Sequence, residues 1–229
     1  MKILALETSA KSVSCAVTED GAVLASAYQC TGLTHSRTLM PMVEDLLKNA
    51  ELTLDEIDRI AIAAGPGSFT GLRIGVAAVK GLAWAVDKPC CAVSTLEAMA
   101  QNVRHMDRLI IGAMDARRNQ IYNALFEAKG GALTRLCADR AIGLDELCEE
   151  LKGDSRHKIV LGDGGKLCFD YLTSHSIDCT LAPAQLLYQN AVGVALTAEH
   201  GEAISAQELA PVYLRPAQAE RLRNEKESK

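Results

Sequence analysis

Short apolar runs near the beginning of the chain are separated by polar turns. The runs cover residues 3–6, 12–17 and 23–28, and a turn signal, Glu-Asp-Gly, occupies 19–21. Runs of this length, rich in small and β-branched residues and bounded by turns, are typical of strands. The opening therefore predicts a meander of antiparallel strands.

Two later segments indicate helices. Between 37 and 50 the apolar residues recur every three or four positions, most clearly at Leu39, Val43 and Leu46. Pro41 falls inside this segment, so we expect a kink or a late start of the helix. Residues 72–86 predict a second helix, which is apolar nearly all round.

The remaining elements of the first half follow from shorter signals. Thr53 and Glu56 have the spacing of a capping box, which predicts a short helix. A buried strand at 60–64, a sharp loop at 65–71, a strand at 90–93 and a helix at 95–103 complete this half.

The opening pattern then recurs. Residues 110–133 repeat the strand, acidic residue, bend, second strand and glycine turn of 3–24, and a shift of 108 places Glu7 on Asp115. A repeat of this length indicates two similar lobes rather than a solenoid.

The second half carries weaker signals. We expect an amphipathic helix at 142–151, a strand at 158–161 and a helix at 184–199. The predicted organisation is an N-terminal, partner-binding lobe at 1–103 and a C-terminal lobe at 104–204. The final segment, 205–229, is expected to pack back on the lobes and then fray into a charged tail.

The composition is that of an ordinary folded protein. The 229 residues are 48% hydrophobic and 23% charged, which is sufficient for one domain or two small ones. The net charge of −5 argues against strong nucleic-acid binding by the chain alone, because neutralising phosphates requires clustered Lys and Arg. The one basic cluster, at 215–223, also contains glutamate.

No membrane segment is expected. The longest apolar stretches, such as 76–86, are broken by Lys80 and Gly81, whereas a spanning helix needs about 20 apolar residues. The apolar start at 1–6 is too short for a secretory signal. The 8 cysteines include no C-x-x-C pair and are expected to be reduced, mostly buried thiols. We therefore expect a cytoplasmic protein.

The sharpest motif is the stretch GPGSFTGLRIG at 65–75. Its glycines permit a tight turn from strand to helix, and Ser68 or Thr70 can cap the helix that follows. The free N–H groups at the start of that helix could hold an anion. The alternative, which the spacing alone favours, is that the loop only packs one element on another.

No catalytic, cofactor or metal site is predicted. The stretch 162–166 lacks the spacing of a P-loop, and the residues around Ser68 lack the glycines of a nucleophile elbow. The 5 histidines include no H-x-x-x-H pair. Glu7 and Asp115 could form a carboxylate pair across a cleft, but nothing in the sequence brings them to one reacting atom.

The second predicted helix contains Gly71, Gly75 and Gly81 together with several alanines. A glycine inside a helix costs roughly 1 kcal/mol, so such a helix usually has another backbone close by. Two interpretations remain open. Part of its cover comes from another chain, or it is a fully buried core helix.

Several motifs accompany the glycine-rich stretch in a fixed order. They are ILALETS at 3–9, His35-Ser36 before Met40-Pro41, STL at 94–96, MDAR at 114–117 before Tyr122, and PVYLR at 211–215. With these motifs the chain resembles, over nearly its whole length, the bacterial TsaB family, also called YeaZ. The resemblance implies an actin/Hsp70-like (ASKHA) α/β fold, in which two similar lobes each hold a mixed five-stranded sheet flanked by helices.

The resemblance also implies a non-catalytic scaffold subunit. Such a subunit binds the paralogue TsaD as a heterodimer and recruits the ATPase TsaE for threonylcarbamoyl transfer to adenosine 37 of ANN-decoding tRNAs. It forms a homodimer when alone and reaches tRNA only through the complex. TsaD carries an H-x-x-x-H metal motif that this chain lacks. The alternative is an enzyme of the same superfold, either a phosphotransferase or a glycoprotease-like peptidase.

The resemblance places the TsaD interface on the helices at 36–50 and 70–86. The candidate contacts, chosen by periodicity, are Leu39, Val43, Leu46, Gly71, Leu72, Gly75, Val76, Val79 and Lys80. The signature loop is Gly65, Pro66, Gly67, Ser68, Phe69 and Thr70. The first phosphate-loop acid of the superfold is usually Asp, and Glu7 at this position weakens the case for nucleotide binding. No cofactor is therefore expected.

Overall fold

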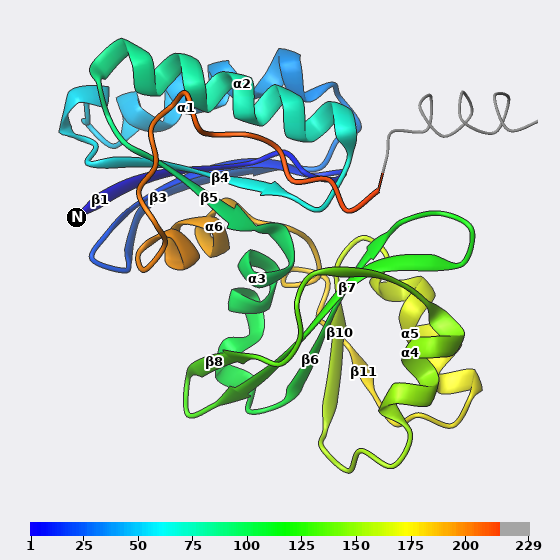
Figure 1. The fold of residues 1–229 in the computed structure, drawn as a ribbon. Helices are drawn as coiled ribbons and strands as arrows, with labels where there is room; N and C mark the ends of the chain where they lie inside the picture. Colours follow the sequence, from blue (N-terminus) through cyan, green and yellow to red (C-terminus); the bar gives the residue numbers. More distant parts are fainter. Residues whose placement is uncertain (216–229) are drawn as a thin grey trace, which may run out of the picture.

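The computed structural model describes residues 1–215, which fold into two lobes (Figure 1). The first lobe is built on a mixed five-stranded sheet with the order β3-β2-β1-β4-β5. Its strands are β1 (Lys2–Glu7), β2 (Val13–Glu19), β3 (Ala22–Gln29), β4 (Arg59–Gly65) and β5 (Cys90–Ser94). The predicted antiparallel meander is β1 to β3, and β4 and β5 extend the sheet in parallel beyond β1.

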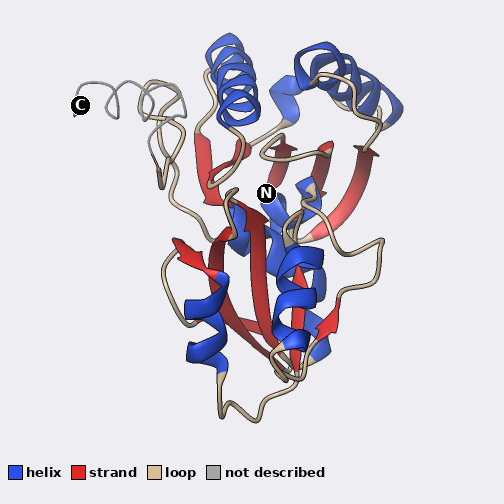
Figure 2. Cartoon of the chain, turned by 90° about the vertical axis from the view of Figure 1, so that its right-hand side faces the viewer, coloured by secondary structure: helices blue, strands red, loops and turns tan. Residues whose placement is uncertain are grey.

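Different helices cover the two faces of this sheet, because side chains alternate along each strand. Leu4 and Leu6 of β1 lie in the cluster beneath α1 (His35–Asn49) and α2 (Phe69–Val86). Ile3 and Ala5 lie in the opposite cluster, with α6 (Ala191–Ala198). Figures 1 and 2 show α1 and α2 side by side over the outer face of the first sheet.

The second lobe repeats the first. Its sheet has the order β11-β10-β6-β7-β8, with the additional strand β9 paired to β7. The strands are β6 (Leu109–Asp115), β7 (Gln120–Lys129), β8 (Ala132–Arg135), β9 (Arg140–Gly143), β10 (Lys158–Leu161) and β11 (Thr180–Leu181). Helices α4 (Leu144–Leu151) and α5 (Gly165–Ser174) pack on it.

The duplication and the actin/Hsp70-like architecture are confirmed. Each lobe has an antiparallel meander followed by two parallel strands, and Glu7 and Asp115 are the last residues of the equivalent strands β1 and β6. One detail differs, since the second sheet has six strands rather than five. Strand β7 is 10 residues long, so its first half pairs with β9 and its second half pairs with β8.

Several helix boundaries differ from the sequence prediction. The first helix begins at His35 and continues through Pro41, so its start is not late. The second begins inside the stretch predicted as a loop, because Ser68 caps it by accepting a hydrogen bond from the Gly71 N–H at 3.3 Å. The helix predicted at 142–151 begins at Leu144, because Ile142 and Gly143 belong to β9. Only the second half of the predicted helix at 184–199 is helical, as α6.

The short helices agree more closely with the sequence prediction. The Glu56 carboxylate accepts hydrogen bonds from the N–H and hydroxyl of Thr53, both at 2.8 Å, which confirms the capping box. This box starts a 3₁₀ helix at Leu54–Glu56. The helix predicted at 95–103 is α3 (Thr95–Ala100), continued by a 3₁₀ helix at Gln101–Met106.

Helices α3 and α6 lie where the two lobes meet. Leu96 and Met99 of α3 pack into a cluster with Phe126 of the second sheet. On its other side α3 crosses α6 so closely that a Cβ at Gly193 would lie 2.1 Å from the carbonyl oxygen of Ala98. The lobe boundary at 103/104 stays a prediction, and α6, which falls inside the predicted second lobe, packs on the sheet of the first lobe.

The C-terminal segment returns to the first lobe and then reaches the second, as far as it is described. The N–H of Val212 donates to the carbonyl of Ala64 at 2.7 Å. The Arg215 guanidinium donates to the carbonyl of Ala116 at 3.2 Å and to the side chain of Gln120. The rest of the segment 205–229, whose end is predicted to fray, lies outside the described residues from 216 onward.

Helix α2 is, among residues 1–215, the one helix whose length and hydropathy would suffice to cross a membrane. One of its faces packs on the first sheet, with Leu72, Val79 and Ala83 almost fully buried. A core helix meets the same criteria of length and composition.

Candidate functional site

The signature loop packs tightly against the connection between β1 and β2. A Cβ at Gly67 would lie 2.5 Å from the carbonyl oxygen of Ser9, and a Cβ at Gly71 would lie 2.1 Å from that of Thr8. The N–H of Ser68 donates to the same Ser9 carbonyl at 2.7 Å. These contacts account for the glycines by packing, which is the interpretation that the spacing alone favoured.

The other side of the loop contacts the C-terminal segment. Gly65 has a φ of +143°, and a Cβ there would lie 2.2 Å from the carbonyl oxygen of Val212. The rings of Phe69 and Tyr213 stack with their centroids 4.4 Å apart. Of the two remaining residues of the loop, Pro66 is buried and Thr70 is exposed.

A cleft of about 450 Å³ lies between the two lobes. Its polar and charged lining comes from both lobes and from the C-terminal segment: Ser9, Lys11, Ser68, Asp115, Arg117, Asp163 and Arg215. The cleft thus brings the signature loop together with the acidic end of β6 and with the loop that follows β10.

Glu7 is buried beside this cleft, at the end of β1. Its Oε1 accepts a hydrogen bond from the N–H of Ser9, whereas its Oε2 has no partner within the protein. Burial raises the pKa of Glu7 to about 7, and the charge of Asp163 adds to the rise. The carboxyl of Glu7 therefore keeps its proton into the neutral range.

Asp163 is the acid that sequence reasoning missed. It follows β10, which pairs in parallel with β6, so the carboxyl ends of both strands meet at the cleft. Burial raises the pKa of Asp163, while the amide of Gln189 donates to its Oδ1 at 3.1 Å. The signal available was an acid directly after a buried strand, in the glycine-rich stretch at 162–165.

Asp115 has a different environment from its repeat partner Glu7. It is exposed, and its Oδ1 accepts a hydrogen bond from the N–H of Arg117 at 2.8 Å. The charge that adds to the raised pKa of Glu7 is that of Asp163. Within residues 1–215 no cluster of three or more metal-ligating side chains is present.

The residues predicted to contact a partner are mostly in the core of this chain. Eight of the nine are buried between the helices and the first sheet: Leu39, Val43, Leu46, Gly71, Leu72, Gly75, Val76 and Val79. The ninth, Lys80, is half-buried and donates to the carbonyl of Gln207 at 3.3 Å. The periodicity therefore identified the core-facing side of each helix, and these buried side chains are not available to another protein.

The opposite side of the same helices is exposed and partly apolar. We call it the outer helical face and define it by exposed residues of α1 and α2: Met40, Glu44, Ala77, Gly81 and Trp84. Trp84 is 65% exposed and Met40 is 42% exposed, so both present large apolar surfaces to solvent. A Cβ at Gly81 would meet nothing within 4 Å, so this glycine has no packing role inside the chain.

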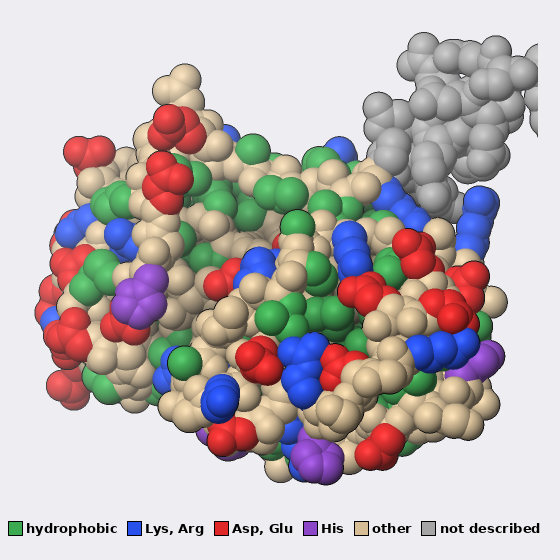
Figure 3. Space-filling view, turned by 60° about the horizontal axis from the view of Figure 1, so that its bottom comes forward, with side chains coloured by type: hydrophobic (Ala, Val, Ile, Leu, Met, Phe, Trp, Pro, Cys, Tyr) green, Lys and Arg blue, Asp and Glu red, His purple; other side chains and the backbone are tan. Residues whose placement is uncertain are grey.

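Charged side chains are mixed over the face shown in Figure 3. Lysine and arginine alternate there with aspartate and glutamate, and no area of one sign dominates. On the second lobe Arg135 pairs with Glu97 at 2.7 Å and with Asp139 at 2.6 Å. Such a surface lacks the clustered positive charge that tracks a phosphate backbone.

Comparison with known proteins gives a consistent set of relatives. The family model "TsaD: tRNA N6-adenosine threonylcarbamoyltransferase" matches residues 29–210. The tRNA threonylcarbamoyladenosine biosynthesis protein TsaB of Bacillus subtilis is 36% identical over 96% of both chains. The protein of the same name from Haemophilus influenzae is 30% identical over 94% of both chains. A solved structure from Pseudomonas aeruginosa, described as similar to peptidase YEAZ, has a TM-score of 0.80 at 28% identity, covering 93% of this chain and 99% of that one.

Proposed function

Because the chain belongs to the TsaB family of tRNA threonylcarbamoyladenosine biosynthesis proteins, we propose that it is a non-catalytic scaffold subunit of the modifying complex. It binds a TsaD-type transferase through the outer helical face and recruits TsaE to the pair in the cytoplasm. The complex then transfers the threonylcarbamoyl group to adenosine 37 of ANN-decoding tRNAs.

The observation that carries this proposal is the exposed, partly apolar surface of α1 and α2. Trp84 and Met40 stand out as large apolar side chains, and exposed apolar surface with aromatic residues is a common feature of protein interfaces. Ala77 and Gly81 lie on the same side of α2 and leave room for another helix to approach closely.

The match to the TsaD family model supports the kind of partner. It covers residues 29–210 and therefore includes both helices of the outer helical face. A TsaD-type partner that shares these two helices can place them against α1 and α2. The result is a bundle of helices from two related chains, packed through small residues.

A scaffold role also fits the environment of Glu7. This acid is fully buried, and one of its oxygens accepts a hydrogen bond from the backbone of Ser9. It is therefore held within the first lobe instead of facing the cleft. Contact with tRNA is proposed to occur through the partner subunits, because the net charge of this chain is −5.

The cleft favours a second candidate function, an enzyme of the same superfold. Asp115 and Asp163 line this space of about 450 Å³, and carboxylates in a cleft can act as general bases or hold a cation. A phosphotransferase or a peptidase would use this site without the partner. ATP turnover or peptide cleavage by the purified chain alone would favour this candidate.

The experiment that tests the scaffold proposal compares two glutamate substitutions at exposed alanines. Ala77→Glu places a charge on the outer helical face, and Ala184→Glu is the matched control on the second lobe. Calorimetric titration with the TsaD-type partner should show at least about tenfold weaker binding for Ala77→Glu, because a charge buried at an interface is costly. Unchanged affinity for Ala77→Glu would place the partner elsewhere.

A further inference from the structure

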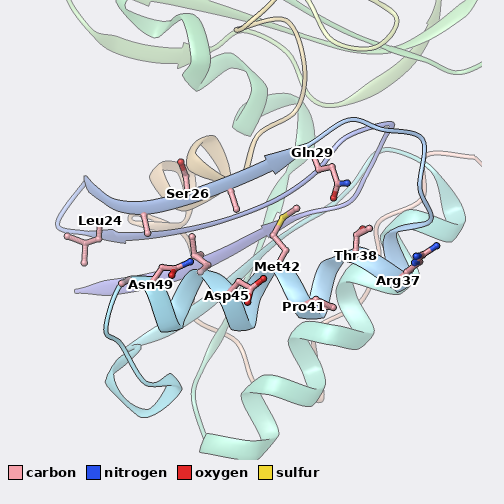
Figure 4. Close-up of a pocket in the computed structure, with 13 residues that line it drawn as sticks. Leu24, Ser26, Gln29, Arg37, Thr38, Pro41, Met42, Asp45 and Asn49 are labelled. Atoms are coloured by element: carbon pink, nitrogen blue, oxygen red, sulfur yellow. The ribbon is translucent and has the colours of Figure 1, made fainter.

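Two hollows of the molecule are related to the lobes in different ways. The groove of about 580 Å³ between β3 and α1 is lined by residues of the first lobe alone, as Figure 4 shows. The cleft of about 450 Å³ is lined by both lobes, so its shape depends on how the lobes are held together. The contacts between the lobes beside this cleft are therefore the ones that can open or close it.

Gln189 joins the two lobes beside the cleft, and its side chain is almost fully buried. Its backbone carbonyl accepts a hydrogen bond from the hydroxyl of Ser12, in the first lobe, at 3.0 Å. Its side-chain amide donates to Oδ1 of Asp163, in the second lobe, at 3.1 Å. The N–H of Ala191, two residues later, donates to the hydroxyl of Ser14 at 2.9 Å. The segment around Gln189 is thus tied to both lobes.

Two buried acceptor oxygens lie in this region without a hydrogen-bond donor from the chain. They are Oε2 of Glu7 and Oε1 of Gln189, and both residues face Asp163, Glu7 through its charge and Gln189 through its hydrogen bond. The Ser9 hydroxyl also faces the Glu7 carboxyl, but a bond between these two leaves Oε1 of Gln189 unpaired. Buried polar atoms are costly when they are left unpaired.

One proton can satisfy both oxygens. A carboxylate and an amide oxygen only accept hydrogen bonds, whereas a protonated carboxyl has one O–H to donate. A proton on Oε2 of Glu7 therefore allows this atom to donate to Oε1 of Gln189. The hydrogen bonds then run without a break from the N–H of Ser9 through Glu7 and Gln189 to Asp163.

The charges around Glu7 favour this proton. The charge that acts on Glu7 is that of Asp163, which is itself under the opposing influence of Asp115 and Lys11. Burial and the charge of Asp163 together raise the pKa of Glu7 to about 7. The other charged side chains that line the cleft come from the second lobe and the C-terminal segment: Arg117 and Arg215.

We propose that Glu7, Gln189 and Asp163 form a latch between the lobes, which is complete only while Glu7 carries its proton. When Glu7 loses the proton to solvent, its Oε2 and Oε1 of Gln189 face each other as two acceptors. The negative charge of Glu7 then also faces that of Asp163, so the closed arrangement is disfavoured. The latch fails, and the lobes move apart until water reaches both carboxylates. This inference does not rest on the proposed function, because all of its contacts are within the chain.

The direction of the pH dependence follows from the affinity of each form for the proton. The closed form holds the proton on Glu7 with a pKa of about 7, against 4.5 for a glutamate in water. The form that binds the proton more tightly is favoured at low pH. The preference for the closed form should therefore be complete below about pH 4.5 and be lost as the pH rises to about 7.

Small-angle X-ray scattering of the monomer fraction at pH 5 and pH 8 tests the latch. The radius of gyration of the wild-type chain should be larger at pH 8. Glu7→Gln should keep the smaller radius at both pH values, because its uncharged amide can donate to Oε1 of Gln189 in place of the proton. Glu146→Gln, at an exposed position of α4, is the matched control and should expand as the wild type does.

A second variant removes the middle of the latch. Gln189→Leu can neither donate to Asp163 nor accept from Glu7, so it should show the larger radius already at pH 5. Gln189 is buried, and circular dichroism should therefore establish that this variant is folded. The comparison of the wild type with Glu7→Gln stands without it. A wild-type radius that is the same at pH 5 and pH 8, or a Glu7→Gln variant that expands as the wild type does, would overturn the proposal.

Discussion

A Cβ atom at Gly75 would lie 2.3 Å from the hydroxyl oxygen of Thr8, closer than any two such atoms can approach. The same Cβ would lie 2.7 Å from Cδ1 of Ile62 in β4. The Thr8 hydroxyl also donates to the carbonyl of Gly71 at 2.8 Å, which joins the end of β1 to the start of α2. The close contacts of this helix are therefore within its own chain, with the backbone of Thr8 at Gly71 and with the side chains of Thr8 and Ile62 at Gly75.

The two glycines at 75 and 81 should respond to substitution in opposite directions. Gly75→Ala should lower the free energy of unfolding by about 1–3 kcal/mol, because the added methyl group overpacks the core. Gly81→Ala should raise it by about 0.5–1 kcal/mol, because this site is open and alanine favours the helix. Urea denaturation of both variants measures the difference. Equal effects would contradict the packing described for α2.

The stability of the fold should depend on pH through Glu7. Its pKa is about 7 in the folded chain, against an ordinary value of 4.5 for a glutamate carboxyl in water, so the folded state binds more protons between these values. Stability should therefore fall as the pH rises from about 4.5 to 7 and then level off. The total contribution is roughly 3 kcal/mol, at about 1.36 kcal/mol for each pKa unit.

Glu7→Gln should remove this part of the profile. The variant keeps a side-chain oxygen to accept the hydrogen bond from Ser9 but has no proton to lose. Its stability relative to the wild type should rise with pH across the same window, as measured by urea denaturation at pH 5, 6, 7 and 8. Glu56→Gln, at an exposed cap, is the matched control and should show no such rise. Parallel profiles for the wild type and Glu7→Gln would show that Glu7 does not titrate in this window.

Tyr213 should anchor the C-terminal segment. Its ring stacks on Phe69, and its hydroxyl accepts a hydrogen bond from Nε of Arg73 at 2.9 Å. Tyr213→Ala should cost about 1–2 kcal/mol, and Tyr213→Phe, which keeps the stack, should cost about half as much. Hydrogen exchange at 205–215 should accelerate in the alanine variant. Unchanged exchange there would mean that other contacts hold the segment.

Features set by local sequence were predicted well. The capping box of Thr53 and Glu56 depends on residues three apart, and the strands of both meanders follow from short apolar runs between turns. The repeat that carries Glu7 and Asp115 also predicted two lobes of the same topology. The second half of the helix expected at 184–199 is α6, and its late start has a local cause. Asn190 caps it by accepting a hydrogen bond from the Val192 N–H at 2.9 Å.

Features set by packing between distant segments were not predictable in the same way. The sequence of a helix that is apolar nearly all round does not indicate which side packs on the sheet. The periodicity therefore selected Leu72 and Val79 as partner contacts, although both lie in the core. Asp163 was missed because its place in the cleft depends on the pairing of β10 with β6. The exposure of Trp84 could not be predicted from the sequence, because a tryptophan in an apolar helix is more often buried.

The position of α6 has a consequence for synthesis on the ribosome. The first sheet is complete once residue 94 has been translated, yet one of its faces is covered by Ala191, Val194 and Ala195. The carbonyl of Ala64, near the end of β4, likewise gains its hydrogen bond from the N–H of Val212 only after that residue has been translated. A nascent chain thus carries an uncovered apolar sheet until about a hundred further residues have emerged. Exposed apolar surface favours aggregation, so we expect the polypeptide to be most prone to aggregate during that interval.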